Sequence, residues 1–111
     1  DPKDLKLAQR ALTRAVEREP RPAEAMLLLG ELWQRRRLRV PEAEKNALAW
    51  YEQAAEAGLE LPRYREALAR FLADTGDLAR AEEMLRDLAD APGIDPTTPL
   101  VLLELALARA R

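Results

Sequence analysis

The chain has 111 residues, with 18 Lys and Arg against 20 Asp and Glu, a net charge of −2, and neither Cys nor His. This length suits one domain or a piece of one, and the missing Cys, His and Ser exclude Cys/His zinc sites and Ser, Cys or His catalysis. The small negative charge argues against nucleic-acid binding, and no apolar run approaches the roughly 20 residues that span a bilayer.

Ala, Leu, Glu and Arg dominate the composition, and β-branched residues are scarce. The common residues lose little freedom in a helix, whereas strands favour the scarce ones. An all-α fold is therefore expected. A site built from carboxylates alone stays open, but interspersed acids and bases are typical of solvated helix surfaces. We expect no enzyme activity, metal or cofactor.

Proline and glycine divide the chain into about six helices. In chain order these are predicted at 3–18, 23–37, 43–57, 62–74, 78–90 and 98–110. The prolines lie near helix starts, where a missing N–H costs little, and Gly58 and Gly76 lie at helix ends, where a positive φ is expected. Asp77 and either Thr97 or Thr98 are candidate N-caps.

Apolar residues recur every three or four positions, as in helices packed against helices. The stripes are Leu5, Ala8, Leu12 and Ala15; Met26, Leu29, Gly30 and Trp33; Ala47, Trp50, Tyr51 and Ala54; Leu68, Ala69 and Leu72; and Ala81, Met84, Leu85 and Leu88.

Two of these patterns repeat. Ala8-x3-Leu12-x2-Ala15 returns as Ala47-x3-Tyr51-x2-Ala54 and as Ala81-x3-Leu85-x2-Leu88, with 34 residues from Ala47 to Ala81. The second pattern, Met26-x2-Leu29-Gly30-x2-Trp33, returns as Leu68-Ala69-x2-Leu72 and as Leu102-x2-Leu105-Ala106. The chain thus alternates two helix types.

These residues resemble the tetratricopeptide repeat, and Ala47, Trp50, Tyr51, Ala54, Ala55 and Gly58 match the second helix of its Sel-one-like variant. The resemblance implies a right-handed superhelical stack of antiparallel helix pairs. Residues 1–22 would be a half-repeat, 23–61 a repeat with a five-residue insertion, 62–98 a repeat and 99–111 a half-repeat, together a segment of a longer array. The family's G-x-G-V loop is replaced here by Arg37, Leu38, Arg39 and Val40, so its conformation is not carried over.

The adjacent Trp50 and Tyr51 admit two interpretations, a ligand pocket or core packing. Aromatic residues at helical spacing usually build core, so packing is favoured. Small residues such as Gly30, Ala47 and Ala54 would let helices approach closely, with Trp33 and Tyr51 filling the spaces and Trp50 packing on the neighbouring repeat.

The remaining faces supply candidate binding residues. If the apolar stripes face partner helices, a groove for a partner polypeptide would be lined by Glu24, Leu27, Glu31, Gln34, Arg35, Arg63, Glu66, Arg70 and Asp74; an ordinary solvated surface is the alternative. Arg35, Arg36, Arg37 and Arg39 either complement a helix dipole or bind an anionic partner. The family's carboxylate clamp is not expected, because its Lys and Asn positions are occupied here by Leu27 and Glu31 in one repeat and by Glu66 and Arg70 in the next.

The segment 98–110 is apolar on nearly every side, and Leu100, Leu103 and Leu107 could self-associate, giving a homodimer through 98–110. The leading hypothesis is a non-catalytic protein–protein interaction scaffold with a protein partner and no nucleic acid or membrane insertion. The resemblance adds bacterial envelope or exopolysaccharide-secretion assemblies as a setting, and a soluble protein of cytoplasm or periplasm. The alternative is an oligomerisation or spacer segment of a larger protein.

Overall fold

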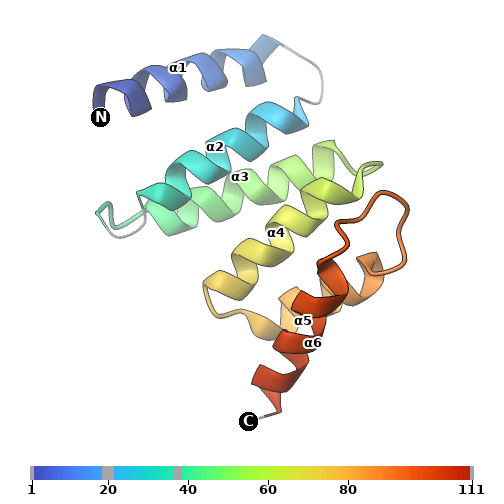
Figure 1. Ribbon diagram of the computed structural model, residues 1–111. Coiled ribbons are helices and arrows are strands. Elements are labelled where there is room, and N and C mark those ends of the chain that lie inside the picture. The colour runs from blue at the N-terminus through green and yellow to red at the C-terminus, as the bar shows by residue number, and fades with distance from the viewer. Residues whose placement is uncertain (1, 19–21, 37–38, 111) are drawn as a thin grey trace. The chain divides into compact units, whose positions relative to one another are not determined.

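The computed structural model describes residues 2–18, 22–36 and 39–110. Within these ranges the chain forms six α-helices and no strand (Figure 1), so the predicted all-α class and helix number are confirmed. The helices are α1 (Pro2–Arg18), α2 (Ala23–Arg35), α3 (Ala43–Ala57), α4 (Pro62–Asp74), α5 (Leu78–Leu88) and α6 (Thr98–Arg109).

A local sequence signal marks the start of α5. The carboxylate of Asp77 accepts the backbone N–H of Arg80 (3.3 Å), so the predicted N-cap of α5 is confirmed. Thr97 is the N-cap of α6 by position but makes no side-chain cap; its hydroxyl donates to Asp95 instead. The helices α2 and α5 each end two residues earlier than predicted.

The glycines behave differently from one another. Gly76 and Gly93 have φ of 99° and 78°, the left-handed region that a Cβ disfavours. Gly58 ends α3 with φ of −106°, so the expectation of a positive φ there was wrong. Its N–H still donates to the carbonyl of Ala54 (2.9 Å), which closes the last turn of the helix.

The described chain divides into two compact units, Asp1–Gly58 and Leu59–Arg111. In the first unit α2 and α3 run antiparallel and pack most extensively, while α1 packs on α2 (Figure 1). Its core includes Leu29 from α2 and Ala47, Tyr51 and Ala54 from α3, which confirms these members of the predicted stripes.

A close contact in this unit lies between Gly30 and Tyr51. A Cβ placed on Gly30 would lie only 3.2 Å from carbon atoms of the Tyr51 ring, and Tyr51 is 4% exposed. The ring therefore occupies the space that the missing side chain leaves, as predicted. At its far end, the Tyr51 hydroxyl donates to Oε1 of Gln34 (2.5 Å).

Trp33 of α2 differs from this expectation, whereas the predicted packing of Trp50 on the neighbouring repeat stays a prediction. Trp33 and Trp50 are partly exposed, as is Met26, whereas Ala25 and Leu32 are buried. The buried face of α2 is thus rotated relative to the predicted stripe, because α2 packs on α1 as well as on α3. A helix that packs on two other helices needs a wider apolar face than a helix that packs on one.

In the second unit, α4 packs on α5 and α5 packs on α6. The predicted Leu68, Ala69 and Leu72 of α4 and Ala81, Leu85 and Leu88 of α5 are all buried, joined by Tyr64 and Phe71; Met84 is partly exposed. The predicted superhelical stacking of successive pairs stays a prediction.

Candidate protein-interaction surfaces

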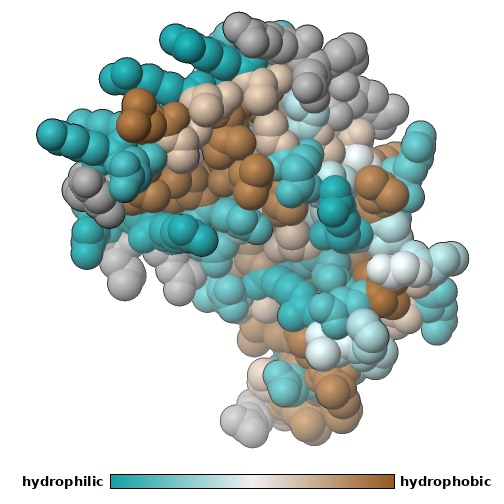
Figure 2. All heavy atoms as spheres, turned by 45° about the horizontal axis from the view of Figure 1, so that its top comes forward, coloured by the Kyte–Doolittle hydropathy of each residue, from teal (hydrophilic) through white to brown (hydrophobic). Residues whose placement is uncertain are grey.

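An apolar groove runs between α1 and α2. It encloses about 430 Å³ and is lined by Leu5, Ala8, Ala11 and Leu12 of α1 and by Leu28, Glu31, Leu32 and Arg35 of α2. Figure 2 shows apolar side chains gathered between these two helices. Two charged residues of opposite sign lie beside an otherwise apolar lining, which is a surface suited to an amphipathic segment.

A second apolar surface lies on α6. Leu100, Leu103 and Leu107 are 62%, 56% and 56% exposed, and their spacing places them on one side of the helix. We call this set the leucine stripe. Figure 2 shows apolar atoms over α6 near its carboxyl end. The three residues predicted for self-association therefore do lie on the surface of the described chain.

The residues predicted for a groove on α2 do not share one environment. Glu24, Glu31 and Arg35 are exposed, and Leu27 is partly exposed. Gln34 instead accepts the hydroxyl of Tyr51 from α3. Gln34 thus takes part in the contact between α2 and α3, which the linear pattern did not indicate.

The predicted groove residues of α4 are also partly used inside their own unit. Glu66 forms an ion pair with Arg70 (4.0 Å) and accepts the hydroxyl of the fully buried Thr98, and Arg70 donates to the hydroxyl of Thr97 (3.2 Å). These two residues connect α4 to the start of α6, so their replacement would perturb the fold as well as any binding.

The two remaining residues of this set, Arg63 and Asp74, are exposed. The guanidinium of Arg63 lies over the ring of Tyr64, 4.7 Å from its centroid, and donates to its hydroxyl (2.6 Å). This stacking holds Arg63 close to the surface of α4.

The arginine cluster is likewise divided. Arg36 lies 5.4 Å from the Trp33 ring centroid and donates to Oε1 of Gln9 on α1 (2.9 Å), so it links α1 to α2. Arg35 and Arg39 are exposed. Arg37 lies outside the described residues, as does Leu38. The N–H groups of Arg39 and Val40 both donate to the carbonyl of Arg36, which turns the chain toward α3.

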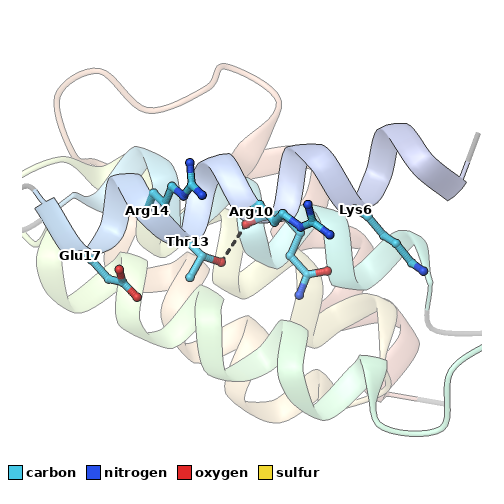
Figure 3. A pocket seen from close by; sticks show the side chains of 6 residues that line it. Lys6, Arg10, Thr13, Arg14 and Glu17 are labelled. Carbon is cyan, nitrogen blue, oxygen red and sulfur yellow. Dashed lines mark hydrogen bonds between the residues drawn. The ribbon is translucent and has the colours of Figure 1, made fainter.

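The exposed side of α1 carries cations that the sequence analysis did not single out. Lys6, Arg10 and Arg14 lie along one side of this helix, beside Gln9, Thr13 and Glu17, around an open hollow of about 550 Å³ (Figure 3). The Thr13 hydroxyl donates to the Gln9 carbonyl (2.7 Å) and is thereby satisfied within the helix. The four-residue spacing of Lys6, Arg10 and Arg14 could have revealed this basic side.

Sequence reasoning also missed Glu82. Its side chain is buried, with the residue 5% exposed, and its carboxylate binds Arg86 within α5 (2.5 Å) and Arg109 of α6 (2.6 Å). A buried carboxylate needs such partners. No local pattern pairs Glu82 with Arg109, because they are 27 residues apart.

The loop before α6 supplies a pH-dependent contact. Asp95 accepts the backbone N–H and the hydroxyl of Thr97 (both 2.8 Å), and these bonds hold the pKa of Asp95 below its ordinary value of 3.8. The pKa of Asp95 is lower in the folded chain than in the unfolded chain, so its contacts stabilise the fold at pH values above the unfolded-state pKa. This stabilisation is lost as the pH falls through the folded-state pKa.

We therefore expect the stability difference between the wild type and Asp95→Asn to shrink on acidification. The wild type should be the more stable at pH 7, with the two urea-denaturation curves converging below about pH 4. Asp90→Asn, which removes one exposed charge elsewhere in the same unit, is the control. A difference between wild type and Asp95→Asn that stays constant from neutral to acid pH would contradict the assignment.

No group of three or more acidic side chains is placed to hold a metal ion in the part of the chain that the structure describes. No described helix combines the length and apolarity needed to cross a membrane. No protein-family model matches the chain, and the comparison with curated proteins finds no match.

Proposed function

We propose that this chain is a non-catalytic protein–protein interaction scaffold of the tetratricopeptide-like, Sel-one-like type, which binds a partner polypeptide. The observation that carries the proposal is the leucine stripe of α6, whose members are each more than half exposed. Contiguous exposed apolar surface of this kind marks interaction sites.

The repeat pattern relates the leucine stripe to the groove residues predicted from the sequence. When Leu105-Ala106 is aligned with Leu29-Gly30, Leu100, Leu103 and Leu107 align with Glu24, Leu27 and Glu31. The same alignment with Leu68-Ala69 gives Arg63, Glu66 and Arg70. One side of the first-type helices therefore changes from mixed charge on α2 and α4 to apolar on α6.

The apolar residues at these positions of α6 favour an amphipathic partner. A helix with apolar residues at i, i+3 and i+7 would match the leucine stripe, because the stripe has that spacing and spans about 10 Å along α6. Burial of the three leucines would supply most of the binding free energy.

A capture experiment with a matched pair of variants tests the proposal. Leu103→Glu places a charge in the leucine stripe, and Ala79→Glu places the same charge at an exposed position of α5. Proteins retained from a cell extract by immobilised wild type and Ala79→Glu should be depleted about tenfold or more with Leu103→Glu, a loss of about 1.4 kcal/mol. Circular dichroism confirms that both variants fold.

Equal retention by Leu103→Glu and Ala79→Glu would contradict the proposal, as would the absence of any protein specific to the wild type. Substitution of Arg70 is a poor alternative probe, since this residue also connects α4 to α6.

The alternative function is oligomerisation within a larger protein, and the exposure of the leucine stripe favours it as well. Two α6 helices packed through Leu100, Leu103 and Leu107 would form a symmetric contact. Light scattering separates the two functions: a wild-type dimer that Leu103→Glu converts to a monomer supports the alternative, and a wild-type monomer that still captures a partner supports the scaffold.

A further inference from the structure

The basic side of α1 carries charges that destabilise its own helix. Lys6, Arg10 and Arg14 are exposed and follow one another every four residues; we call them the basic stripe. Figure 3 shows their side chains projecting from this one helix. None of the three side chains forms an ion pair or a hydrogen bond with another described residue. Like charges four residues apart on a helix repel each other, so the basic stripe lowers the stability of α1.

The equivalent side is also exposed in α5, which is a second-type helix like α1 and α3. In the repeat alignment, which pairs Ala8 with Ala81, the basic stripe corresponds to three exposed residues of α5: Ala79, Glu83 and Asp87. The helix α5 packs both on the helix before it and on the helix after it. This side of a second-type helix therefore stays open even where both neighbouring helices are present.

The charge of this side differs from one second-type helix to the next. It is basic in α1 and acidic in α5, and in α3 the equivalent residues are Lys45, Ala49 and Gln53, again all exposed. Helix formation and packing thus accept either sign of charge at these positions. A stripe of one sign that the fold does not require, in a chain with a net charge of −2, is a local conflict of the kind expected at a functional surface.

The neutral polar groups beside the basic stripe have partners within the molecule. Oε1 of Gln9 accepts the guanidinium of Arg36 (2.9 Å), and the Thr13 hydroxyl donates to the carbonyl of Gln9 (2.7 Å). Of the side chains that line the hollow, the three cations and Glu17 have no hydrogen-bond or ion-pair partner among the described residues. Arg36 adds a further positive charge next to Gln9, so this surface attracts anionic groups.

Glu17 distinguishes between kinds of anionic partner. It lines the same hollow three residues beyond Arg14, so the charges along this side are three positive followed by one negative. A uniform polyanion, such as a nucleic acid, would bring negative charge against Glu17, which is unfavourable. A polypeptide can present three acids and one base in the matching order.

We propose that the basic stripe and Glu17 bind an acidic helical segment of a partner polypeptide, with three carboxylates facing the stripe and a Lys or Arg facing Glu17. Successive members of the stripe lie about 6 Å apart along α1, and acids at i, i+4 and i+8 of a partner helix have the same spacing. This surface differs in chemistry from the leucine stripe, and binding at one does not depend on binding at the other.

Two alanine-rich synthetic peptides of equal composition test the proposal. The matched peptide carries Glu at i, i+4 and i+8 and Lys at i+11, and its isomer exchanges the Lys with the middle Glu. Fluorescence anisotropy measures their binding to the 111-residue chain at about 50 mM salt, where exposed charges are weakly screened. The wild type should bind the matched peptide about tenfold more tightly than the isomer, and Arg10→Glu should lower the affinity for the matched peptide by about tenfold or more.

Three further comparisons separate the charge pattern from other effects. Arg10→Glu should prefer the isomer, because the middle residue of this peptide is Lys. Lys45→Glu makes the same change of charge at the α3 position equivalent to Lys6, and it should leave the affinity unchanged. Leu103→Glu in the leucine stripe should bind the matched peptide as the wild type does, so this test is independent of the proposed function.

The stability of Arg10→Glu provides a second measurement. The substitution removes the repulsion of Arg10 by Lys6 and Arg14, so its melting temperature should equal or exceed that of the wild type. A lower melting temperature would show that Arg10 stabilises the fold, and it would overturn the assignment of the stripe to binding.

Equal affinity of the wild type and Arg10→Glu for the matched peptide would also overturn the proposal, as would equal affinity of the wild type for the two peptides. An oligothymidylate that binds the wild type more tightly than the matched peptide does, and that loses this affinity with Arg10→Glu, would show a nucleic-acid surface instead.

Discussion

Replacement of Tyr51 by alanine is expected to lower the free energy of unfolding by about 3–5 kcal/mol, the range for truncation of a large buried side chain. Tyr51 is 4% exposed and its ring fills the space above Gly30. Neither α2 nor α3 could close on the cavity without giving up the alanine contacts along the same pair. Urea denaturation followed by circular dichroism measures the effect.

Two further variants show how much of the lost stability comes from the Tyr51 hydroxyl and how much depends on the burial of the ring. Tyr51→Phe keeps the ring and removes only the hydroxyl bond to Gln34, so about 1 kcal/mol is expected. Trp50→Ala should cost clearly less than Tyr51→Ala, because Trp50 is partly exposed. A melting temperature that Tyr51→Ala leaves unchanged would disprove the core assignment.

Introduction of valine at Gly30 is the second substitution with a large expected effect, a loss of about 3 kcal/mol. The Cβ alone would lie 3.2 Å from the Tyr51 ring, and the branched side chain adds two further methyl groups at the contact. The ring cannot retreat freely, since its hydroxyl is bound to Gln34 at 2.5 Å. In Gly30→Ala, the helix propensity gained, about 1 kcal/mol, should largely offset the milder overlap.

The double variant Gly30→Val/Tyr51→Ala tests whether the two effects share one cause. Removal of the ring leaves room for the valine, so the double variant should be destabilised by at least about 1 kcal/mol less than the sum of the single variants. Additive losses would mean that the ring and the glycine do not contact each other as described.

Much of the secondary structure could be predicted because its causes are local. The starts of α2 to α6 follow from proline positions and, for α5, from the Asp77 cap. The glycine–tyrosine contact could also be predicted, because a repeated spacing brings equivalent residues of successive helices into equivalent contacts. The error at Gly58 shows the limit of the local rule, since a glycine at a helix end permits a positive φ without requiring it.

The candidate surfaces were predicted less well. The exposed leucine stripe follows from the apolar content of α6 and was found in the sequence. Gln34, Glu66 and Arg70 were assigned to an open groove, yet each has a hydrogen-bond partner on another helix. The repeated apolar pattern indicated which helix faces pack together. It did not indicate which polar side chains beside those faces form hydrogen bonds with a neighbouring helix.

What the sequence by itself determined, then, is the helices, their alternating types and the small-to-large matching of α2 with α3, all of which depend on residues within one or two turns or on a regular repeat. Only the tertiary structure decided that Trp33 is partly exposed, that Arg36 bonds to Gln9 and that Glu82 binds Arg109. The physical reason is that a polar side chain takes whichever partner the packed backbone brings within about 3 Å, and that distance is a property of the assembled helices and not of their spacing along the chain.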